Sequence, residues 1–132
     1  MPSITGASHV ALTVRDMAAS AKWYQDVFGW QPVRRLSGEE AGSPRILLFD
    51  PQSRFMVAVC EPAADAGDRF DHRRVGLDHL ALAVADEAAL REWIEHLDRL
   101  DVAHSPVRQF GPAQFLTVDD PDGIQIEFWL QP

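Results

Sequence analysis

Apolar and polar residues alternate over two short stretches of the chain, residues 8–14 and 78–84. An alternation of period two indicates a strand with one apolar and one polar face. In the segments that follow, apolar residues recur at helical spacing. Asp16 and Asp86 precede these segments as typical helix N-caps, and Gly29 is a typical end for the first helix. Each half of the chain is therefore predicted to begin with a strand and an amphipathic helix.

Three more strands are expected in each half, because Gly, Pro, Asp and Ser turn signals divide the remaining apolar stretches. Each half then contains a strand, a helix and three strands, which together form a βαβββ module. The expected strands are residues 31–37, 44–49 and 54–60 in the first half, and residues 102–107, 113–118 and 124–130 in the second.

The two halves align with each other at a shift of 70 residues. Residues 8–16 then fall on residues 78–86 with His, Ala, Leu, Val and Asp identical, and Asp50-Pro51 falls on Asp120-Pro121. A match of this density, in phase at both ends, indicates an internal structural repeat.

The repeat predicts an α+β fold made of two βαβββ modules related by a pseudo-two-fold axis. The modules span about 7–62 and 77–132, with a charged linker over 63–76. A module of about 60 residues buries too little surface to be secure alone, so we expect a single domain over residues 1–132. The helices would cover the apolar strand faces, leaving a curved mixed sheet around a cup.

The polar faces of the predicted strands carry the candidate chemistry. His9 and His79 occupy equivalent positions in the repeat, and Glu127 lies on the polar face of the last strand. Alanines beside them leave space for a ligand. Two neutral imidazoles and one carboxylate suit a divalent metal, namely Fe, Mn, Ni, Co or Zn, and leave positions open for a small-molecule substrate. We therefore predict a metal site of His9, His79 and Glu127.

The fourth strand of the first module breaks the symmetry of this site. At the 70-residue shift the counterpart of Glu127 is Val57, and with a one-residue bulge it is Ala58. Neither side chain can bind a metal. An apolar pocket wall is expected instead, formed by Phe55, Val57, Val59, Phe115 and Trp129.

Composition and charge narrow the class of protein. The 132 residues suit one domain, and the net charge of −8 argues against nucleic acid or an anionic membrane as a partner. No apolar run is long enough for a transmembrane helix, and no secretory signal is visible. The single cysteine, Cys60, excludes an intramolecular disulfide. These features predict a cytoplasmic protein.

Three stretches of the chain resemble the vicinal oxygen chelate superfamily: SHVALTVRDMAASAKWYQDVFGW, GLDHLALAV and DPDGIQIEFW. This group includes glyoxalase I, bleomycin-resistance proteins, methylmalonyl-CoA epimerase, fosfomycin-resistance transferases and extradiol dioxygenases. The resemblance implies metal ligands at His9, His79 and Glu127, and a homodimer. It also implies that the missing fourth ligand disfavours glyoxalase-type isomerase chemistry. Extradiol dioxygenases carry further acid–base residues, for which His72 is the one unassigned candidate.

Two functions follow from this reading of the sequence. The first is a metal-dependent enzyme acting on a small oxygen-bearing substrate chelated to the metal, with dioxygenase-like or lyase- or transferase-like chemistry. The alternative is a non-catalytic protein of the bleomycin-resistance type that binds and sequesters an apolar or aromatic compound.

Overall fold

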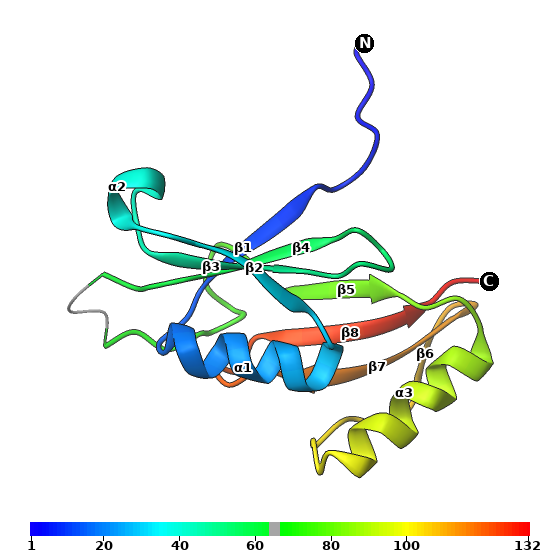
Figure 1. Ribbon diagram of the computed structural model, residues 1–132. Coiled ribbons are helices and arrows are strands. Elements are labelled where there is room, and N and C mark those ends of the chain that lie inside the picture. Colours follow the sequence, from blue (N-terminus) through cyan, green and yellow to red (C-terminus); the bar gives the residue numbers. More distant parts are fainter. Residues whose placement is uncertain (64–66) are drawn as a thin grey trace. The chain divides into compact units, whose positions relative to one another are not determined.

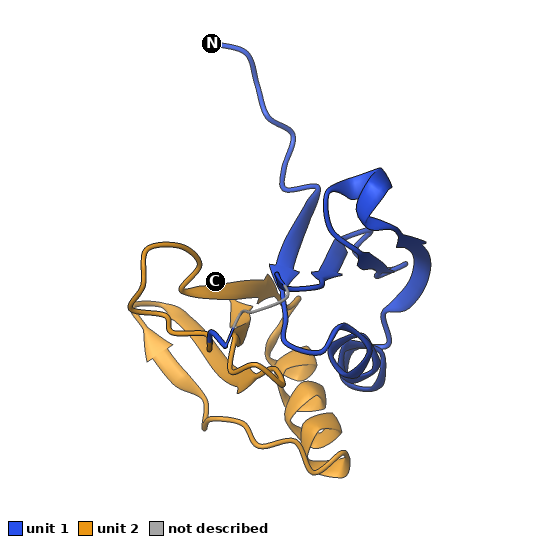
Figure 2. Ribbon diagram, turned by 90° about the vertical axis from the view of Figure 1, so that its left-hand side faces the viewer, with its two compact units in different colours: residues 1–68 blue, residues 69–132 orange. Residues whose placement is uncertain are grey.

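The computed structural model describes residues 1–63 and 67–132 of the chain. It divides into two compact units, Met1–Asp68 and Arg69–Pro132 (Figure 2). Each unit contains one βαβββ module, so the predicted α+β fold with a repeated module is confirmed. Part of the predicted linker, residues 64–66, lies outside the described residues. The single-domain organisation stays a prediction.

Module one, in the first unit, forms a four-stranded sheet in the order β1-β4-β3-β2 (Figure 1). Strand β1 runs parallel to β4, and the other neighbours are antiparallel. Helix α1 packs against β2, β3 and β4. The elements are β1 His9–Thr13, α1 Met17–Phe28, β2 Gln31–Leu36, α2 Gly38–Ala41, β3 Arg45–Phe49 and β4 Met56–Cys60.

Module two, in the second unit, repeats this topology with the sheet order β5-β8-β7-β6. Strand β5 is parallel to β8, and α3 packs against β8. Trp93 of α3 contacts Phe128 with ring centroids 4.5 Å apart. The elements are β5 His79–Ala83, α3 Glu87–Arg99, β6 Arg108–Phe110, β7 Ala113–Asp119 and β8 Gln125–Leu130.

The two long helices begin where the sequence predicts. Asp16 accepts a hydrogen bond from the backbone N–H of Ala19 at 2.9 Å, and Asp86 accepts one from that of Ala89 at 2.8 Å. Each carboxylate satisfies a backbone donor that has no partner inside its helix. Gly29 ends α1 in the left-handed conformation, with φ of 70°. The equivalent caps thus fix equivalent helices after β1 and β5.

The predicted strand over residues 102–107 is wrong. The strand lies at Arg108–Phe110 instead, and the earlier segment makes only an isolated bridge between His104 and Val118. Pro106 has no backbone N–H to donate to a sheet. The hydroxyl of the neighbouring Ser105 accepts a hydrogen bond from the backbone N–H of Thr117 in β7, in place of a backbone carbonyl.

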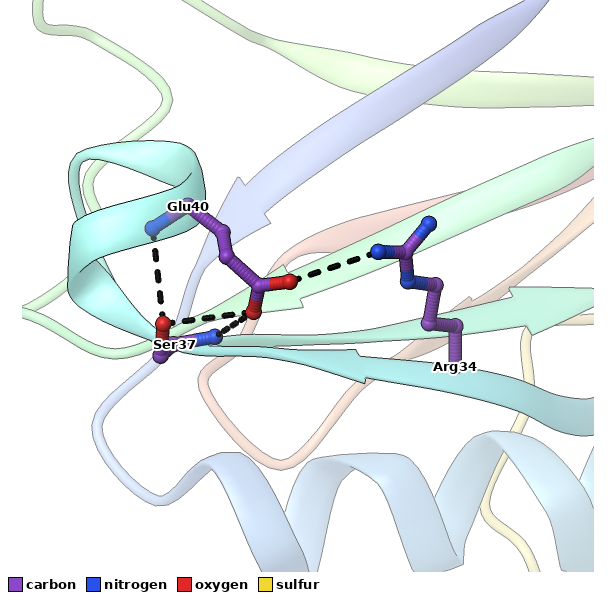
Figure 3. Close-up of polar contacts among 3 residues, drawn as sticks. All are labelled: Arg34, Ser37 and Glu40. Carbon is purple, nitrogen blue, oxygen red and sulfur yellow. Dashed lines mark hydrogen bonds and ion pairs between the residues drawn. The ribbon is translucent and has the colours of Figure 1, made fainter.

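A short helix, α2, lies where the sequence analysis expects only a turn between two strands, at Ser37-Gly38. Ser37 and Glu40 form a reciprocal capping box that fixes this single helical turn (Figure 3). The backbone N–H and the hydroxyl of Ser37 lower the pKa of the Glu40 carboxyl. Glu40 also contacts Arg34 of β2 at 3.3 Å. The Ser-x-x-Glu spacing was the sequence signal for this helix.

The apolar strand faces lie beneath the helices, as their alternation predicted. In module one Leu12, Leu48 and Val59 are almost fully buried, and in module two Ile126 and Phe128 are. No helix in the described part of the chain is long and apolar enough to cross a membrane. The opposite, polar face of each sheet carries the predicted metal ligands, His9 in module one and His79 and Glu127 in module two.

Candidate metal-binding site

His79 and Glu127 come together on one face of the module-two sheet. The parallel register of β5 and β8 pairs His79 with Gln125 and Ala81 with Glu127. Paired residues share a face, so the imidazole and the carboxyl group lie on the same side, one step apart along the strands. The distance from His79 Nε2 to Glu127 Oε2 is 3.6 Å. Two of the three predicted ligands are thus adjacent.

Asp78 determines which nitrogen of His79 is available. Asp78 Oδ1 lies 2.6 Å from His79 Nδ1. Because a carboxylate can only accept, Nδ1 carries the proton and donates it, and the neutral imidazole then presents the lone pair of Nε2. This lone pair is on the nitrogen nearer to Glu127. A carboxylate that orients an imidazole in this way is the common outer partner of a metal-binding histidine.

Glu127 is a buried acid whose Oε2 atom accepts no hydrogen bond from any described residue and has His79 Nε2 at 3.6 Å as its neighbour. Only 6% of its surface is exposed, and among the described residues nothing forms a hydrogen bond with its buried Oε2 atom. A buried polar atom without a partner is costly to the folded protein. A cation at this point would provide the missing interaction. The orphan oxygen and the Nε2 lone pair therefore fit a divalent metal as donors.

An open hollow of about 470 Å³ lies over this pair of donors. Ala81 and Ala83 of β5 leave space there because their side chains are single methyl groups. Of the five residues of the predicted pocket wall, Trp129 borders this hollow, and Phe115 is not part of its lining. The complete lining is His79, Ala81, Ala83, Val84, Glu127, Trp129 and Gln131.

His9 occupies the equivalent position in module one. It is exposed at the start of β1, and Ser8 Oγ lies 3.3 Å from its Nδ1 atom. Ser8 thus stands beside His9 as Asp78 stands beside His79. Within either module, no three His, Cys, Asp or Glu side chains of the described residues gather into a metal-binding group. The three-residue site stays a prediction that joins the two modules.

The strand register corrects the expected wall in module one. Val57 pairs with Val10, and Val59 pairs with Leu12. Val57 and Val59 therefore lie on the apolar face, opposite the face of His9, where they are 1% and 0% exposed. Phe55 precedes β4, and its ring is 6.5 Å from that of the buried Trp30. These three residues do not form a wall on the His9 face.

The counterpart of Glu127 in module one is Ala58 rather than Val57. Ala58 pairs with Ala11 just as Glu127 pairs with Ala81. Of the two alternatives left by the sequence, the register selects the second. Cys60, on the same face as Ala58, is also buried, and burial raises the pKa of its thiol.

His72 lies away from the hollow around Glu127, in a turn organised by Asp71. Asp71 accepts hydrogen bonds from the side chain and the backbone N–H of Arg73. These bonds lower the pKa of Asp71 to about 2. A second hollow, of about 510 Å³, is lined by His72, by neighbouring residues of this turn and by Gly123. A catalytic role for His72 stays a prediction.

Sequence reasoning missed two residues near the hollow. Asp78 stands directly before His79 in the repeat, and this adjacency alone does not predict that the two side chains meet. Phe110, 69% exposed, has its ring 5.9 Å from that of Trp129. It was missed because the sixth strand was placed too early in the chain.

Solved structures with the same fold include proteins of several activities. A glyoxylase/bleomycin resistance protein/dioxygenase domain from Frankia sp. EAN1pec is 30% identical, with a TM-score of 0.85 over 98% of this chain and 94% of that one. Lactoylglutathione lyase from Agrobacterium tumefaciens is 20% identical, with a TM-score of 0.74 over 96% and 94%. The fosfomycin resistance protein FosX from Listeria monocytogenes, complexed with Mn(II) and sulfate, is 18% identical, with a TM-score of 0.68 over 98% and 95%.

The sequence itself matches one family model over nearly its whole length. No curated protein matches the chain. The model described as the Glyoxalase/Bleomycin resistance protein/Dioxygenase superfamily matches residues 6–128. This match and the Frankia structure confirm the resemblance inferred from the repeat and its motifs. The chain belongs to the glyoxalase/bleomycin resistance protein/dioxygenase superfamily.

Proposed function

We propose that this protein is a metal-dependent enzyme of the vicinal oxygen chelate type, acting on a small substrate that binds the metal through its oxygen atoms. The orphan Oε2 of Glu127, 3.6 Å from His79 Nε2, is the observation that supports this proposal most strongly. His79, Glu127 and His9 of module one would hold Fe, Mn, Ni, Co or Zn. The Mn(II) in the FosX structure supports the choice of a divalent ion.

Each residue of the proposed site has a separate task. When bound, the metal supplies a Lewis acid that polarises substrate oxygens and stabilises developing negative charge. Asp78 keeps Nδ1 of His79 protonated and the ring in position. Trp129 borders the hollow and would bind the apolar part of the substrate while excluding water.

Under this proposal the reaction is either dioxygenase-like, or it is lyase- or transferase-like. Ala58 at the position equivalent to Glu127 leaves module one without a carboxylate ligand on β4. This absence disfavours isomerase chemistry that needs a fourth protein ligand. The homodimer and the cytoplasmic location predicted from the sequence remain part of the proposal.

Metal titration of the chelator-treated protein tests the proposed site. We expect the wild-type chain to bind about one equivalent of Mn²⁺ or Co²⁺. Calorimetry would measure the binding of either ion, and visible absorption would measure that of Co²⁺. His79→Ala and Glu127→Gln should each weaken this binding more than tenfold. His96→Ala is the matched control, since His96 lies on α3 of the same module. A wild-type chain that binds none of Fe, Mn, Ni, Co and Zn would contradict the proposal.

Asp78→Asn should weaken metal binding without removing a ligand. An asparagine amide can donate as well as accept, so it no longer holds the His79 ring in a single tautomer. Loss of such an outer partner typically costs about 10- to 100-fold in metal affinity. Calorimetric titration with Mn²⁺ would measure the change. Asp98→Asn is the control, because Asp98 contacts His104 at 3.2 Å outside the site. Equal affinities of wild type and Asp78→Asn would show that Asp78 does not position the ligand.

A non-catalytic binding protein is the second candidate. Two features favour it: Ala58 stands where a carboxylate ligand would be needed in module one, and aromatic side chains surround Trp129. Such a protein would bind its ligand equally well after His79→Ala and would show no turnover. Metal-dependent turnover of any bound compound would exclude this alternative.

A further inference from the structure

One row of side chains crosses the sheet of module two beside the proposed metal site. The strand register places Ala83 of β5 next to Trp129 of β8, and Trp129 next to Phe115 of β7. All three share the face of His79 and Glu127, because paired residues lie on the same side of a sheet. The row therefore ends in a methyl group on one side of the indole and in an aromatic ring on the other.

The two aromatic rings of this row are stacked. The centroids of Phe115 and Trp129 are 5.0 Å apart, and the rings are inclined by 21°. This spacing matches the separation of about 4.8 Å between neighbouring strands. Phe110 adds a third ring, 5.9 Å from Trp129 and inclined by 55°. The indole is thus supported from the side of β6 and β7.

On its other side the indole borders open space. Ala83 is the next residue in the row, and both Ala83 and Trp129 line the hollow of about 470 Å³. A methyl group cannot fill the place where a third stacked ring would stand. A planar ring above Ala83 would lie one strand spacing from the indole, about 4.8 Å away, which is a favourable stacking distance.

The separation between this place and the metal donors limits the ligand further. Glu127 and Trp129 are two residues apart on one strand, which corresponds to about 7 Å. His79 is four residues from Ala83, or about 13 Å. Along the strands, a ring stacked on Trp129 is therefore centred two residues from Glu127 and four residues from His79, and a short linker between the ring and the chelating oxygens would cover this separation.

We propose that module two contains a subsite for an aryl group, and that the substrate joins such a ring to its chelating oxygens through a short linker. The ring would stack on Trp129 above Ala83, while the oxygens reach the metal between His79 and Glu127. The chelating half of this inference rests on the proposed metal site. The aryl half rests on Trp129, Phe115 and Ala83 alone.

Three 2-hydroxy acids of graded shape test the subsite: lactate, 3-cyclohexyllactate and 3-phenyllactate. The cyclohexyl and phenyl groups have similar apolar size, but only phenyl has a flat π-face. We expect the Mn²⁺-loaded protein to bind 3-phenyllactate about 3- to 10-fold more tightly than 3-cyclohexyllactate, as aromatic pairing implies. In ¹³C-methyl alanine spectra of the protein loaded with diamagnetic Zn²⁺, the phenyl ring current should shift the Ala83 methyl signal.

Two variants locate the effect in different ways. Trp129→Leu removes the indole on which the ring would stack. Ala83→Leu fills the space above residue 83 while leaving the indole intact. Both should abolish the preference for phenyl. Ala88→Leu adds the same side chain at an exposed position of α3 and should preserve it. Equal binding of the two ring acids, or an equal loss in Ala83→Leu and Ala88→Leu, would overturn the aryl subsite.

Repeating the titrations in a chelator separates this inference from the metal proposal. If 3-phenyllactate still shifts the Ala83 methyl signal in EDTA and Mn²⁺ adds no affinity, the aryl subsite stands and the metal proposal fails. If Mn²⁺ strengthens binding of all three acids but 3-phenyllactate and 3-cyclohexyllactate bind equally tightly, the metal proposal stands and the aryl subsite is refuted.

Discussion

Glu127→Met is expected to stabilise the metal-free protein, by about 1–3 kcal/mol in the free energy of unfolding. The wild-type carboxyl group is 6% exposed, and no described residue forms a hydrogen bond with its Oε2 atom. Methionine has a similar length and no polar atom to leave unsatisfied. Urea denaturation in EDTA, with both proteins at the same concentration, would measure the gain.

The same substitution should reverse its effect when metal is added. A ligand at 1,000 times its Kd stabilises the folded state by about 4.1 kcal/mol, more than the gain expected for Glu127→Met, and only a chain that keeps its ligands receives this contribution. Mn²⁺ should therefore raise the stability of the wild type and leave that of Glu127→Met unchanged. Glu95→Met is the control, since Glu95 is exposed on α3. Glutamate and methionine have similar helix propensity, so this substitution should leave the stability of the helix nearly unchanged. Lower stability of Glu127→Met in EDTA would mean that the carboxyl group has a stabilising partner.

Such a crossover would identify Glu127 as a residue retained for binding rather than for folding. Residues that bind ligands are often placed where they reduce the stability of the protein. The remainder of the module-two core follows the alternation of its strands, with Ile126 and Phe128 buried on the opposite face of β8. Glu127 is the position in this strand where burial and polarity conflict.

The repeat is the reason that so much of the fold could be predicted from one sequence. Two copies of one pattern provide independent readings of each element, and the caps at Asp16 and Asp86 were identified in both. The prediction failed where the copies differ. Pro106 and Ser105 have no matching counterparts in the first module, and the strand expected there begins later, at Arg108.

The fourth strand of module one shows how a single residue limits such reasoning. The turn before it closes with a hydrogen bond from Asp50 N to Phe55 O, whereas the turn in module two closes from Asp120 N to Ile124 O. The first turn is therefore one residue longer, and Arg54 adopts a φ of 62° within it. A shift of one residue moves every side chain to the other face of the strand. Alignment at a fixed shift consequently assigned Val57 and Val59 to the wrong face.

The contact between Asp78 and His79 could not be predicted from the sequence, for a different reason. A carboxylate directly before a histidine usually points away from it in an extended strand, because successive side chains alternate. Asp78 stands one residue before β5, outside the hydrogen-bonded ladder of the sheet, and its carboxylate reaches His79 Nδ1. Only the geometry shows that the two side chains meet.

Ala58→Glu is expected to destabilise the metal-free protein by about 3–5 kcal/mol, the usual cost of an unpaired buried charge. Ala58 is 2% exposed and is paired with Ala11 on β1 and Leu47 on β3, neither of which offers a hydrogen bond from its side chain. The larger side chain must also displace packed neighbours. The free energy of unfolding in urea, with EDTA present, would measure the cost.

Ala11→Glu is the matched control for this substitution, because Ala11 lies on the same face in the neighbouring strand but is exposed. It should change stability by less than about 1 kcal/mol. A similar effect of the two substitutions would show that Ala58 is not closely packed. A large difference would mean that packing of β4 itself excludes a carboxylate at the position equivalent to Glu127. The three-ligand character of the proposed site would then follow from the core of module one, since a fourth acidic ligand could not be introduced there without weakening the fold.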